Sequence, residues 1–277
     1  MEFTSLGISA PILKALNDRS YKKPTPIQAQ TIPSALEGKD ILGLAQTGTG
    51  KTASFAIPIL QRLADSKFDK NKRIIRSLIL TPTRELAIQI DESFREYGKY
   101  LSLKTLVIYG GIGQGKQVSS LQRGVDILVA TPGRLLDLMN QGFISLKDIE
   151  IFTLDEADRM LDMGFIHDIN KILKVLPQQK QTLLFSATMP KEIDQIAHEL
   201  LHNPERISIT PVSSTVDTVE QSVVYIDNNH KIDWIADFLR DKKKDSVLIF
   251  SRTKHGSDKI VRDLSHKNIK ARAIHGN

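Results

Sequence analysis

The residues with the clearest chemical potential form a glycine-rich run, Ala45-Gln46-Thr47-Gly48-Thr49-Gly50-Lys51-Thr52. Glycines let successive backbone N–H groups converge on phosphate oxygens, because no Cβ stands in the way. In such a run the lysine ammonium reaches the β- and γ-phosphates, and the Thr52 hydroxyl is a ligand for Mg²⁺. Ala45 occupies a position where the general pattern has glycine, so the match depends on Gly50-Lys51-Thr52 and on the flanking elements. We predict a P-loop; the alternative is a glycine-rich turn that binds nothing.

A second group of candidates is the acidic run Asp155-Glu156-Ala157-Asp158, which follows the apolar segment 149–154. Open α/β sheets bind ligands outside the carboxyl ends of their strands, and this run lies at such an end. We assign Asp155, with Thr52, to Mg²⁺, and Glu156 to the attacking water, so that Glu156, Lys51 and Asp155 form the catalytic set. The alternative is an acidic first helical turn that complements the helix dipole. The nearby P-loop favours the catalytic interpretation.

The elements that must position these residues alternate between short apolar runs and amphipathic stretches, which predicts βαβ units and a mostly parallel sheet. Several runs are continuously apolar, as expected of a sheet covered on both faces. The expected strands are 40–44, 77–80, 104–108, 126–130, 149–154, 182–185 and 206–209. The expected helices include 53–63, 84–100, 134–141 and 193–201.

A change in composition divides the chain near residue 210. Segment 210–218 is rich in Ser and Thr, contains Pro211 and has no helical period, so it is predicted to be a linker. The alternation then restarts, with expected strands at 219–226, 246–250 and 270–275 and helices near 231–239 and 257–266. We therefore predict a first domain at 1–209, a linker at 210–218 and a partial second domain at 219–277.

Bulk composition limits the class of protein. The chain has 277 residues, of which 40% are hydrophobic and 25% charged, and it contains no cysteine. These values, with no bilayer-length apolar run and no secretory leader, lead us to expect a cytoplasmic protein without membrane contact. The formal net charge of +6 is compatible with a nucleic-acid partner, but a scattered lysine excess on a solvated surface explains it equally well.

Taken together, these motifs resemble those of the DEAD-box ATP-dependent RNA helicases, most closely the bacterial RhlE-like proteins. The segment Tyr21-Lys22-Lys23-Pro24-Thr25-Pro26-Ile27-Gln28 is similar to the family's Q motif, although Ser20 stands where glycine is usual. The resemblance implies that Gln28 reads the adenine edge and that Phe3 stacks on the base. A glutamine amide can pair bidentately with adenine. Without this context, Gln28 would be interpreted as a polar residue at a helix start. The implied nucleotide contacts outside the P-loop are Phe3, Tyr21, Lys23, Thr25 and Gln28.

The resemblance also implies contacts to the RNA backbone from three further loops. Each loop combines phosphate-directed donors with residues that allow close backbone approach, and none has a base-reading pattern, so sequence-independent binding is expected. Each loop alone could be an ordinary strand–helix connection. The implied residues are Pro82, Thr83, Arg84, Gly110, Gly111, Thr131, Pro132, Gly133 and Arg134.

Two remaining segments complete the resemblance. Ser186-Ala187-Thr188 is similar to the motif that couples ATP hydrolysis to strand separation, and we expect Ser186 and Thr188 to act through hydrogen bonds toward Asp158. Segment 247–253 resembles a strand-and-turn motif of the family's second domain, and the same residues would also make a buried strand with a helix cap at Thr253. The implied fold is a RecA-like P-loop NTPase domain followed by a truncated second RecA-like domain.

The implied function is RNA-stimulated hydrolysis of ATP with Mg²⁺, which clamps single-stranded RNA and locally unwinds duplexes. The family's arginine finger and half of its RNA clamp lie beyond the matched segments, so the chain alone is expected to be poorly active. Two alternatives stay open: a DNA-directed P-loop helicase, which the Q motif disfavours, and a nucleotide-dependent binding module without turnover.

Overall fold

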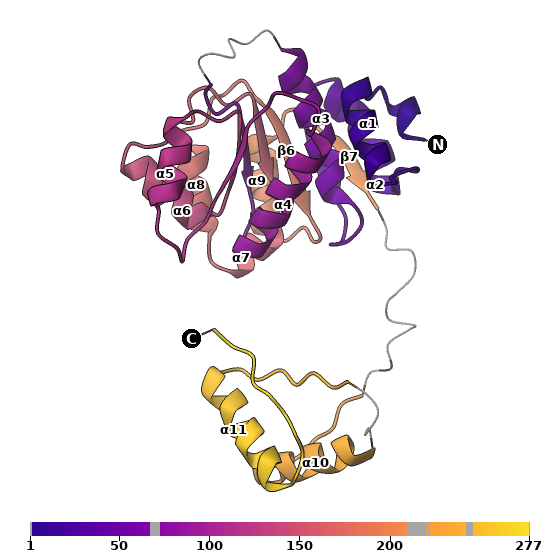
Figure 1. Cartoon of the computed structure of the whole chain (residues 1–277), viewed down its shortest axis with the longest axis vertical. Coiled ribbons are helices and arrows are strands. Elements are labelled where there is room, and N and C mark those ends of the chain that lie inside the picture. The colour runs from indigo at the N-terminus through magenta and orange to yellow at the C-terminus, as the bar shows by residue number, and fades with distance from the viewer. Residues whose placement is uncertain (1, 67–72, 210–219, 221, 242–245, 277) are drawn as a thin grey trace. The chain divides into compact units, whose positions relative to one another are not determined.

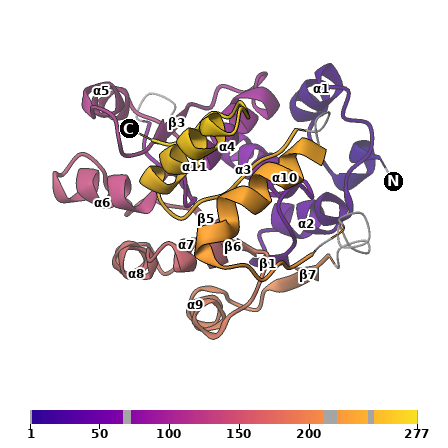
Figure 2. The ribbon, with the colours of Figure 1, turned by 90° about the horizontal axis from the view of Figure 1, so that it is seen from below.

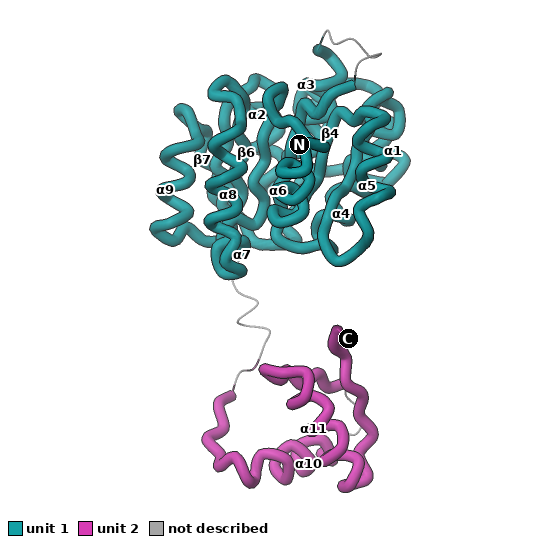
Figure 3. The backbone as a smooth tube through the Cα atoms, turned by 90° about the vertical axis from the view of Figure 1, so that its left-hand side faces the viewer, with its two compact units in different colours: residues 1–213 teal, residues 214–277 magenta. Residues whose placement is uncertain are grey.

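The computed structural model describes residues 2–66, 73–209, 220, 222–241 and 246–276. These residues form two compact units, Met1–Ser213 and Ser214–Asn277 (Figures 1 and 3). The division falls within the segment expected to be a linker, but residues 210–218 lie outside the described part of the chain. The finer domain boundaries therefore stay predictions.

The first unit is built on one seven-stranded sheet in which every strand pair is parallel, in the order β3-β4-β2-β5-β6-β1-β7. Each strand overlaps a segment expected from sequence, which confirms the α/β fold class. The strands are β1 Ile41–Leu44, β2 Ser77–Leu80, β3 Thr105–Ile108, β4 Ile127–Ala130, β5 Ile151–Leu154, β6 Gln181–Ser186 and β7 Glu205–Ser208.

Helices connect the strands and cover both faces of the sheet. They are α1 Ala10–Asp18, α2 Pro26–Leu36, α3 Lys51–Asp65, α4 Arg84–Tyr97, α5 Gly115–Gln122, α6 Pro132–Asn140, α7 Ala157–Asp162, α8 Ile166–Leu173 and α9 Lys191–Leu200, preceded by the 3₁₀ turn η1 Phe3–Leu6. Helix α4 ends three residues before the expected end, and Gly98 follows it as the C-cap residue. Helix α6 begins two residues before the expected start, because Pro132 suits the first helical turn.

Alternation of side chains along the strands separates two hydrophobic layers. One layer contains Ile41, Ile79 and Phe185 and packs against α1–α4; the other contains Leu42, Leu80 and Phe152 and packs against α6–α9. Figure 2 shows α1–α4 on one side of the sheet and α6, α8 and α9 on the other. Gly43 lies opposite Phe185 in the β1–β6 register, and a Cβ at Gly43 would lie 2.5 Å from the Phe185 ring. The glycine therefore allows the aromatic ring to lie across β1, the strand that leads into the P-loop.

The second unit contains helices α10 Lys231–Asp241 and α11 Lys254–His266, which overlap the two expected helices, and a short turn at Asn228–His230. The three expected strands are wrong for this structure: none of the described residues of 219–226, 246–250 and 270–275 belongs to a strand. A strand exists only when its backbone groups pair with a neighbour. Apolar side chains of these segments are exposed, including Tyr225 at 95% and Phe250 at 88%. None of the helices in the described ranges is long and apolar enough to cross a membrane.

Candidate functional site

The predicted site residues gather along the carboxyl edge of the sheet, in two neighbouring groups. The P-loop follows β1, Asp155 follows β5 and Ser186 ends β6, and these three strands are adjacent. The segments beginning at Pro82, Gly110 and Thr131 follow β2, β3 and β4, which are adjacent as well. We call the first group the nucleotide half and the second group the RNA half. The fold therefore brings together residues that are more than 100 positions apart in the chain.

The P-loop adopts the backbone conformation that its glycines allow. Gly48 and Gly50 have positive φ values of 87° and 97°, which disfavour any residue with a side chain. A Cβ on Gly50 would also lie 2.5 Å from the side-chain nitrogen of Gln28. The Ala45 N–H donates to the Ser186 carbonyl at 3.0 Å, and the Thr49 hydroxyl donates to the Gln46 carbonyl at 2.8 Å. The loop is thus anchored to β6 at its first residue.

Two oppositely charged side chains of the nucleotide half are buried, and each has one polar atom without a hydrogen-bond partner. Lys51 is 6% exposed and Asp155 is 4% exposed, and within the described structure neither Lys51 Nζ nor Asp155 Oδ1 has a hydrogen-bond partner. Burial raises the pKa of Asp155 to about 6, although the charge of Lys51 acts in the opposite direction. Buried polar groups normally find partners, so these two atoms fit ligands that come from outside the chain.

Phosphate oxygens would suit the Lys51 ammonium, and a hard cation would suit the Asp155 carboxylate. Thr52, the neighbouring hydroxyl residue at the start of α3, is half-buried. Across the described residues there is no cluster of three His, Cys, Asp or Glu side chains suited to a metal. Mg²⁺ usually takes only one or two protein carboxylates and completes its shell with water and phosphate oxygens. Asp155 and Thr52 are therefore suitable residues for a Mg²⁺ that arrives with a nucleotide.

Glu156 has a carboxylate that is held from two sides. Its backbone is in the left-handed region at φ 55°, which is unusual for a residue other than glycine. The Thr47 hydroxyl donates to Glu156 Oε1 at 3.0 Å, and Arg159 Nη1 lies 3.0 Å from Glu156 Oε2. Sequence reasoning did not identify the contact from Arg159, which follows Glu156 by three residues and lies in α7. The two partners fix the direction in which the buried carboxylate points.

Gln28 connects the Q-motif segment to the P-loop. Its side-chain Oε1 accepts from the Thr25 N–H at 2.9 Å, and its Nε2 donates to the Gly50 carbonyl at 3.1 Å. It lies at the third position of α2, so the interpretation as a polar residue at a helix start is also correct. A primary amide has two donor hydrogens and an oxygen with two lone pairs, so one donor and one acceptor are left. A bidentate contact to adenine needs those two groups.

The other residues of the predicted base site differ in exposure. Tyr21 is 44% exposed and its ring lies 6.1 Å from that of Tyr97, while Lys23 is exposed. Phe3 is only 5% exposed and packs in the core layer of α1–α4. Stacking of Phe3 on a base therefore stays a prediction.

Asp158, Ser186 and Thr188 are in direct contact. The Thr188 N–H and hydroxyl both donate to Asp158 Oδ2 at 2.8 Å, and the Asp158 N–H donates to the Ser186 hydroxyl at 3.2 Å. Burial alone would raise the pKa of Asp158, but the two hydrogen bonds that its carboxylate accepts from Thr188, together with the nearby Ser186 side chain, hold the pKa below its usual value. The expected hydrogen bonds toward Asp158 are present; their role in coupling stays a prediction.

The RNA half has more exposed residues and a side-chain network of its own. Arg84, Gly110, Gly111 and Gly133 are exposed, Thr83 and Thr131 are half-buried, and Pro82 and Pro132 are buried. The Arg84 guanidinium lies 4.9 Å from the Tyr109 ring centre, and the Thr83 hydroxyl accepts from the Leu86 N–H at 3.3 Å.

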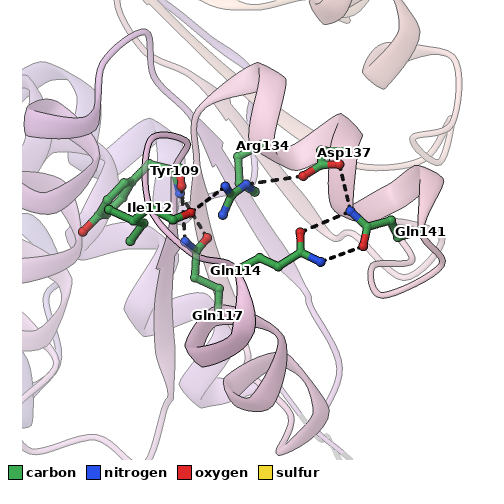
Figure 4. Close-up of polar contacts among 7 residues, drawn as sticks. All are labelled: Tyr109, Ile112, Gln114, Gln117, Arg134, Asp137 and Gln141. Atoms are coloured by element: carbon green, nitrogen blue, oxygen red, sulfur yellow. Dashed lines mark hydrogen bonds and ion pairs between the residues drawn. The ribbon is translucent and has the colours of Figure 1, made fainter.

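Arg134, which we expected to contact RNA, points toward the protein. Its side chain is 11% exposed, and its Nη2 donates to the Ile112 carbonyl at 2.9 Å (Figure 4). Sequence reasoning missed Asp137, Gln141 and Gln114, which continue this network, and Gln117, which pairs separately with the backbone of Tyr109 (Figure 4). The glutamines at 114 and 117 follow the glycine segment closely, but Asp137 and Gln141 lie in another part of the sequence.

Comparison with known proteins places these features in a family. A family model described as DEAD/DEAH box helicase matches residues 25–196. The chain belongs to this family. It is 42% identical over 276 residues to "ATP-dependent RNA helicase CshA" of Limosilactobacillus reuteri, a match that covers 100% of this chain and 54% of that protein.

Two further similar proteins have the same kind of name. "DEAD-box ATP-dependent RNA helicase CshA" of Streptococcus pneumoniae is 40% identical over 276 residues, covering 100% of this chain and 52% of that protein. "ATP-dependent RNA helicase CshA" of Listeria monocytogenes is 41% identical over 275 residues, covering 99% of this chain and 52% of that protein. The chain spans about half the length of these relatives. The finer RhlE-like assignment stays a prediction, since these relatives bear another name.

Proposed function

We propose that this chain is the nucleotide-binding part of an ATP-dependent RNA helicase, which uses ATP with Mg²⁺ to hold single-stranded RNA and open short duplexes. The observation that carries the proposal is the position of Lys51 and Asp155, two buried charged residues with unsatisfied polar atoms, on the same sheet edge as the exposed RNA half. The relatives' names support the same activity. The proposed helicase activity requires both ATP and RNA, so we propose a cytoplasmic location for the protein.

The proposed roles in hydrolysis follow from what each side chain can reach. Lys51 and the backbone N–H groups of the P-loop offset the charge of the β- and γ-phosphates. Thr52 and Asp155 would hold Mg²⁺, which when bound neutralises charge on the same phosphates. Glu156 accepts a proton from the attacking water, and its two contacts, with Thr47 and Arg159, keep its carboxylate oriented for that transfer.

Base selection and RNA binding use separate groups. The remaining donor and acceptor of Gln28 pair with the adenine edge, whereas guanine presents the opposite pattern in that pose. The RNA half offers Arg84, the Thr83 region and exposed glycine backbone, which suit phosphates and sugars of any sequence. The hydrogen-bonded group of Asp158, Ser186 and Thr188 couples the nucleotide state to RNA.

Nucleotide competition tests the first part of the proposal. Calorimetry should show tighter binding of ATP than of GTP to the wild-type chain, and Gln28→Ala should narrow the difference. Gln30→Ala is a matched control, because Gln30 is an exposed glutamine on the same helix. Equal affinity for ATP and GTP in the wild type would contradict the role of Gln28.

Titration with labelled RNA tests the second part. Fluorescence anisotropy should show binding of single-stranded oligonucleotides of unrelated sequence with similar affinity, weakening as salt rises from 50 to 200 mM. A strong preference for one sequence, or no salt dependence, would contradict backbone binding. Turnover of ATP with and without RNA then separates a helicase from a binding module, since a module binds RNA without stimulation.

A further inference from the structure

The glycines of the RNA half differ from the other glycines of the first unit. Most glycines in that unit have either a positive φ or a neighbour that a Cβ would strike. Gly110, Gly113, Gly115 and Gly133 have neither: their φ values are ordinary, and a Cβ would meet nothing within 4 Å. An alanine would fit at all four positions as far as the described protein is concerned. The absence of side chains there is instead explained by something that approaches the backbone from outside.

Gly110 and Gly113 lie in the loop after β3, Gly115 is the first residue of α5, which follows that loop, and Gly133 lies in the first turn of α6. The loop 109–114 also includes Gly111, which has a positive φ of 80°. A loop with so many glycines is flexible unless other groups restrain it, and ordering it on binding would cost affinity. The restraint on this loop comes from side chains, as Figure 4 shows.

Gln117 holds the start of the loop. It is 6% exposed, its Oε1 accepts from the Tyr109 N–H at 3.3 Å, and its Nε2 donates to the Tyr109 carbonyl at 3.2 Å. The amide therefore pairs with both backbone groups of Tyr109, as a neighbouring strand would. Arg134 holds the middle of the loop through the Ile112 carbonyl.

A second contact connects the end of the loop to the far end of α6. Gln114 Nε2 donates to Gln141 Oε1 at 2.8 Å, and Gln141 Nε2 lies 3.2 Å from Gln114 Oε1 and 2.8 Å from Asp137 Oδ1. Asp137 also lies 3.5 Å from Arg134 Nε. The network joins the loop to the helix that carries Gly133, so that the two glycine segments keep a fixed spacing.

We propose that Gln117, Arg134 and the Gln114–Gln141 amide pair are positioning residues that preform the glycine loop and the start of α6 as one surface for the backbone of single-stranded RNA. The proposal rests on the RNA-binding function proposed above and assigns Arg134 mainly to the protein side of that surface. None of the glutamines needs to touch the RNA.

The main test is the exposed amide pair, because its removal leaves the buried core intact. Gln114→Ala and Gln141→Ala should each weaken binding of a labelled single-stranded RNA by about threefold to tenfold, as expected for loss of preorganisation. The double variant should bind no worse than either single variant, since both remove the same contact. ATP affinity should not change. Gln122→Ala is the matched control, an exposed glutamine on α5 outside the network.

The buried residue is tested with Gln117→Met, which keeps the length of the side chain but removes both hydrogen bonds. Amide NMR of protein labelled at glycine gives a readout that a general loss of stability would not produce. The signals of Gly110, Gly111 and Gly113 should broaden or shift, while those of Gly48 and Gly50 stay in place, and RNA affinity should fall.

The outcomes separate this inference from the proposed function. If the wild type binds no RNA, the RNA part of the proposed function is wrong. The positioning role is overturned if the wild type and the variants at Gln114, Gln141 and Gln117 all bind RNA equally well and the glycine signals of Gln117→Met are unchanged. The proposed function stands in that case. Additive losses in the double variant would also overturn the role, because they would mean that each glutamine contacts RNA independently.

Discussion

The two halves of the carboxyl edge differ in what their polar groups do within the protein itself. In the nucleotide half, Lys51 Nζ and Asp155 Oδ1 are buried without hydrogen-bond partners, and Glu156 has a left-handed backbone. In the RNA half, the glutamine amides pair with one another or with the loop backbone, and the exposed residues include Gly110, Gly111 and Gly133. The comparison indicates that the nucleotide half holds buried charged groups that suit a ligand of opposite charge. The RNA half instead holds its loop backbone in a fixed conformation, which suits a ligand that lies on the surface.

The largest expected effect is on the chemical step. Glu156→Gln should lower ATP turnover by about 10²–10⁴ without loss of ATP binding, because an amide cannot accept a proton from water. Steady-state phosphate release, measured on the protein carrying its complete helicase region, checks this. Glu199→Gln, an exposed position on α9, is the control. Turnover equal to that of the wild type would remove Glu156 from the catalytic set.

The next effect is on nucleotide affinity. Lys51→Ala should weaken ATP binding by about 1.5–3 kcal/mol, or about tenfold to 150-fold, through loss of a charge-assisted contact. Affinity for RNA without nucleotide should not change, because Lys51 belongs to the other half of the edge. Calorimetry and anisotropy on the same variant measure both. A parallel loss of RNA affinity would show that the halves are not independent.

A smaller effect concerns stability without nucleotide and Mg²⁺. The pKa of Asp155 is raised from 3.8 to about 6, so the fold favours the protonated carboxyl and is destabilised when it ionises above pH 6. Asp155→Asn should therefore increase the free energy of unfolding at pH 7.5 by at most about 3 kcal/mol, and the gain should disappear as pH falls from 6 toward 4. Urea unfolding in EDTA at a series of pH values measures this. An Asp155→Asn variant less stable than the wild type at pH 7.5 would contradict the claim that the buried, ionised Asp155 carboxylate destabilises the ligand-free fold.

The smallest effect lies in the RNA half. Arg84→Ala should weaken RNA binding similarly for all sequences and reduce the slope of log affinity against log salt by about 1. ATP affinity should stay the same. Arg206→Ala, an exposed arginine on the edge strand β7, provides a control for the loss of one positive charge. An equal change in both variants would mean that net charge, and not the position of Arg84, determines RNA binding.

The sequence predicted the strands of the first unit well, because local apolar runs and turn residues determine them. The P-loop was predicted for the same reason, since its glycines and the adjoining elements are local features. The helices at 10–18, 115–122 and 166–173 were not identified; they are short, and tertiary packing contributes most of their stability.

Side-chain contacts between segments that are distant in the chain could not be predicted from the sequence. The bond between Thr47 and Glu156 joins residues 109 positions apart, and no local pattern encodes it. The direction of Arg134 was missed because a motif names a residue type and not the atom toward which it points. The strands expected in the second unit were wrong in this structure, since an apolar run predicts burial but cannot guarantee a pairing partner.

The position of β1 in the sheet has a consequence for biosynthesis. In the described sheet β1 lies between β6 and β7, the two strands that the ribosome adds last. At about 5–20 residues per second, β1 waits on the order of ten to thirty seconds before β6 emerges. Throughout that interval both edges of β1 lack their native partners, and the P-loop lacks its anchor at Ser186. Nascent chains of this protein are therefore expected to acquire nucleotide affinity late and abruptly, and to depend on chaperones until then.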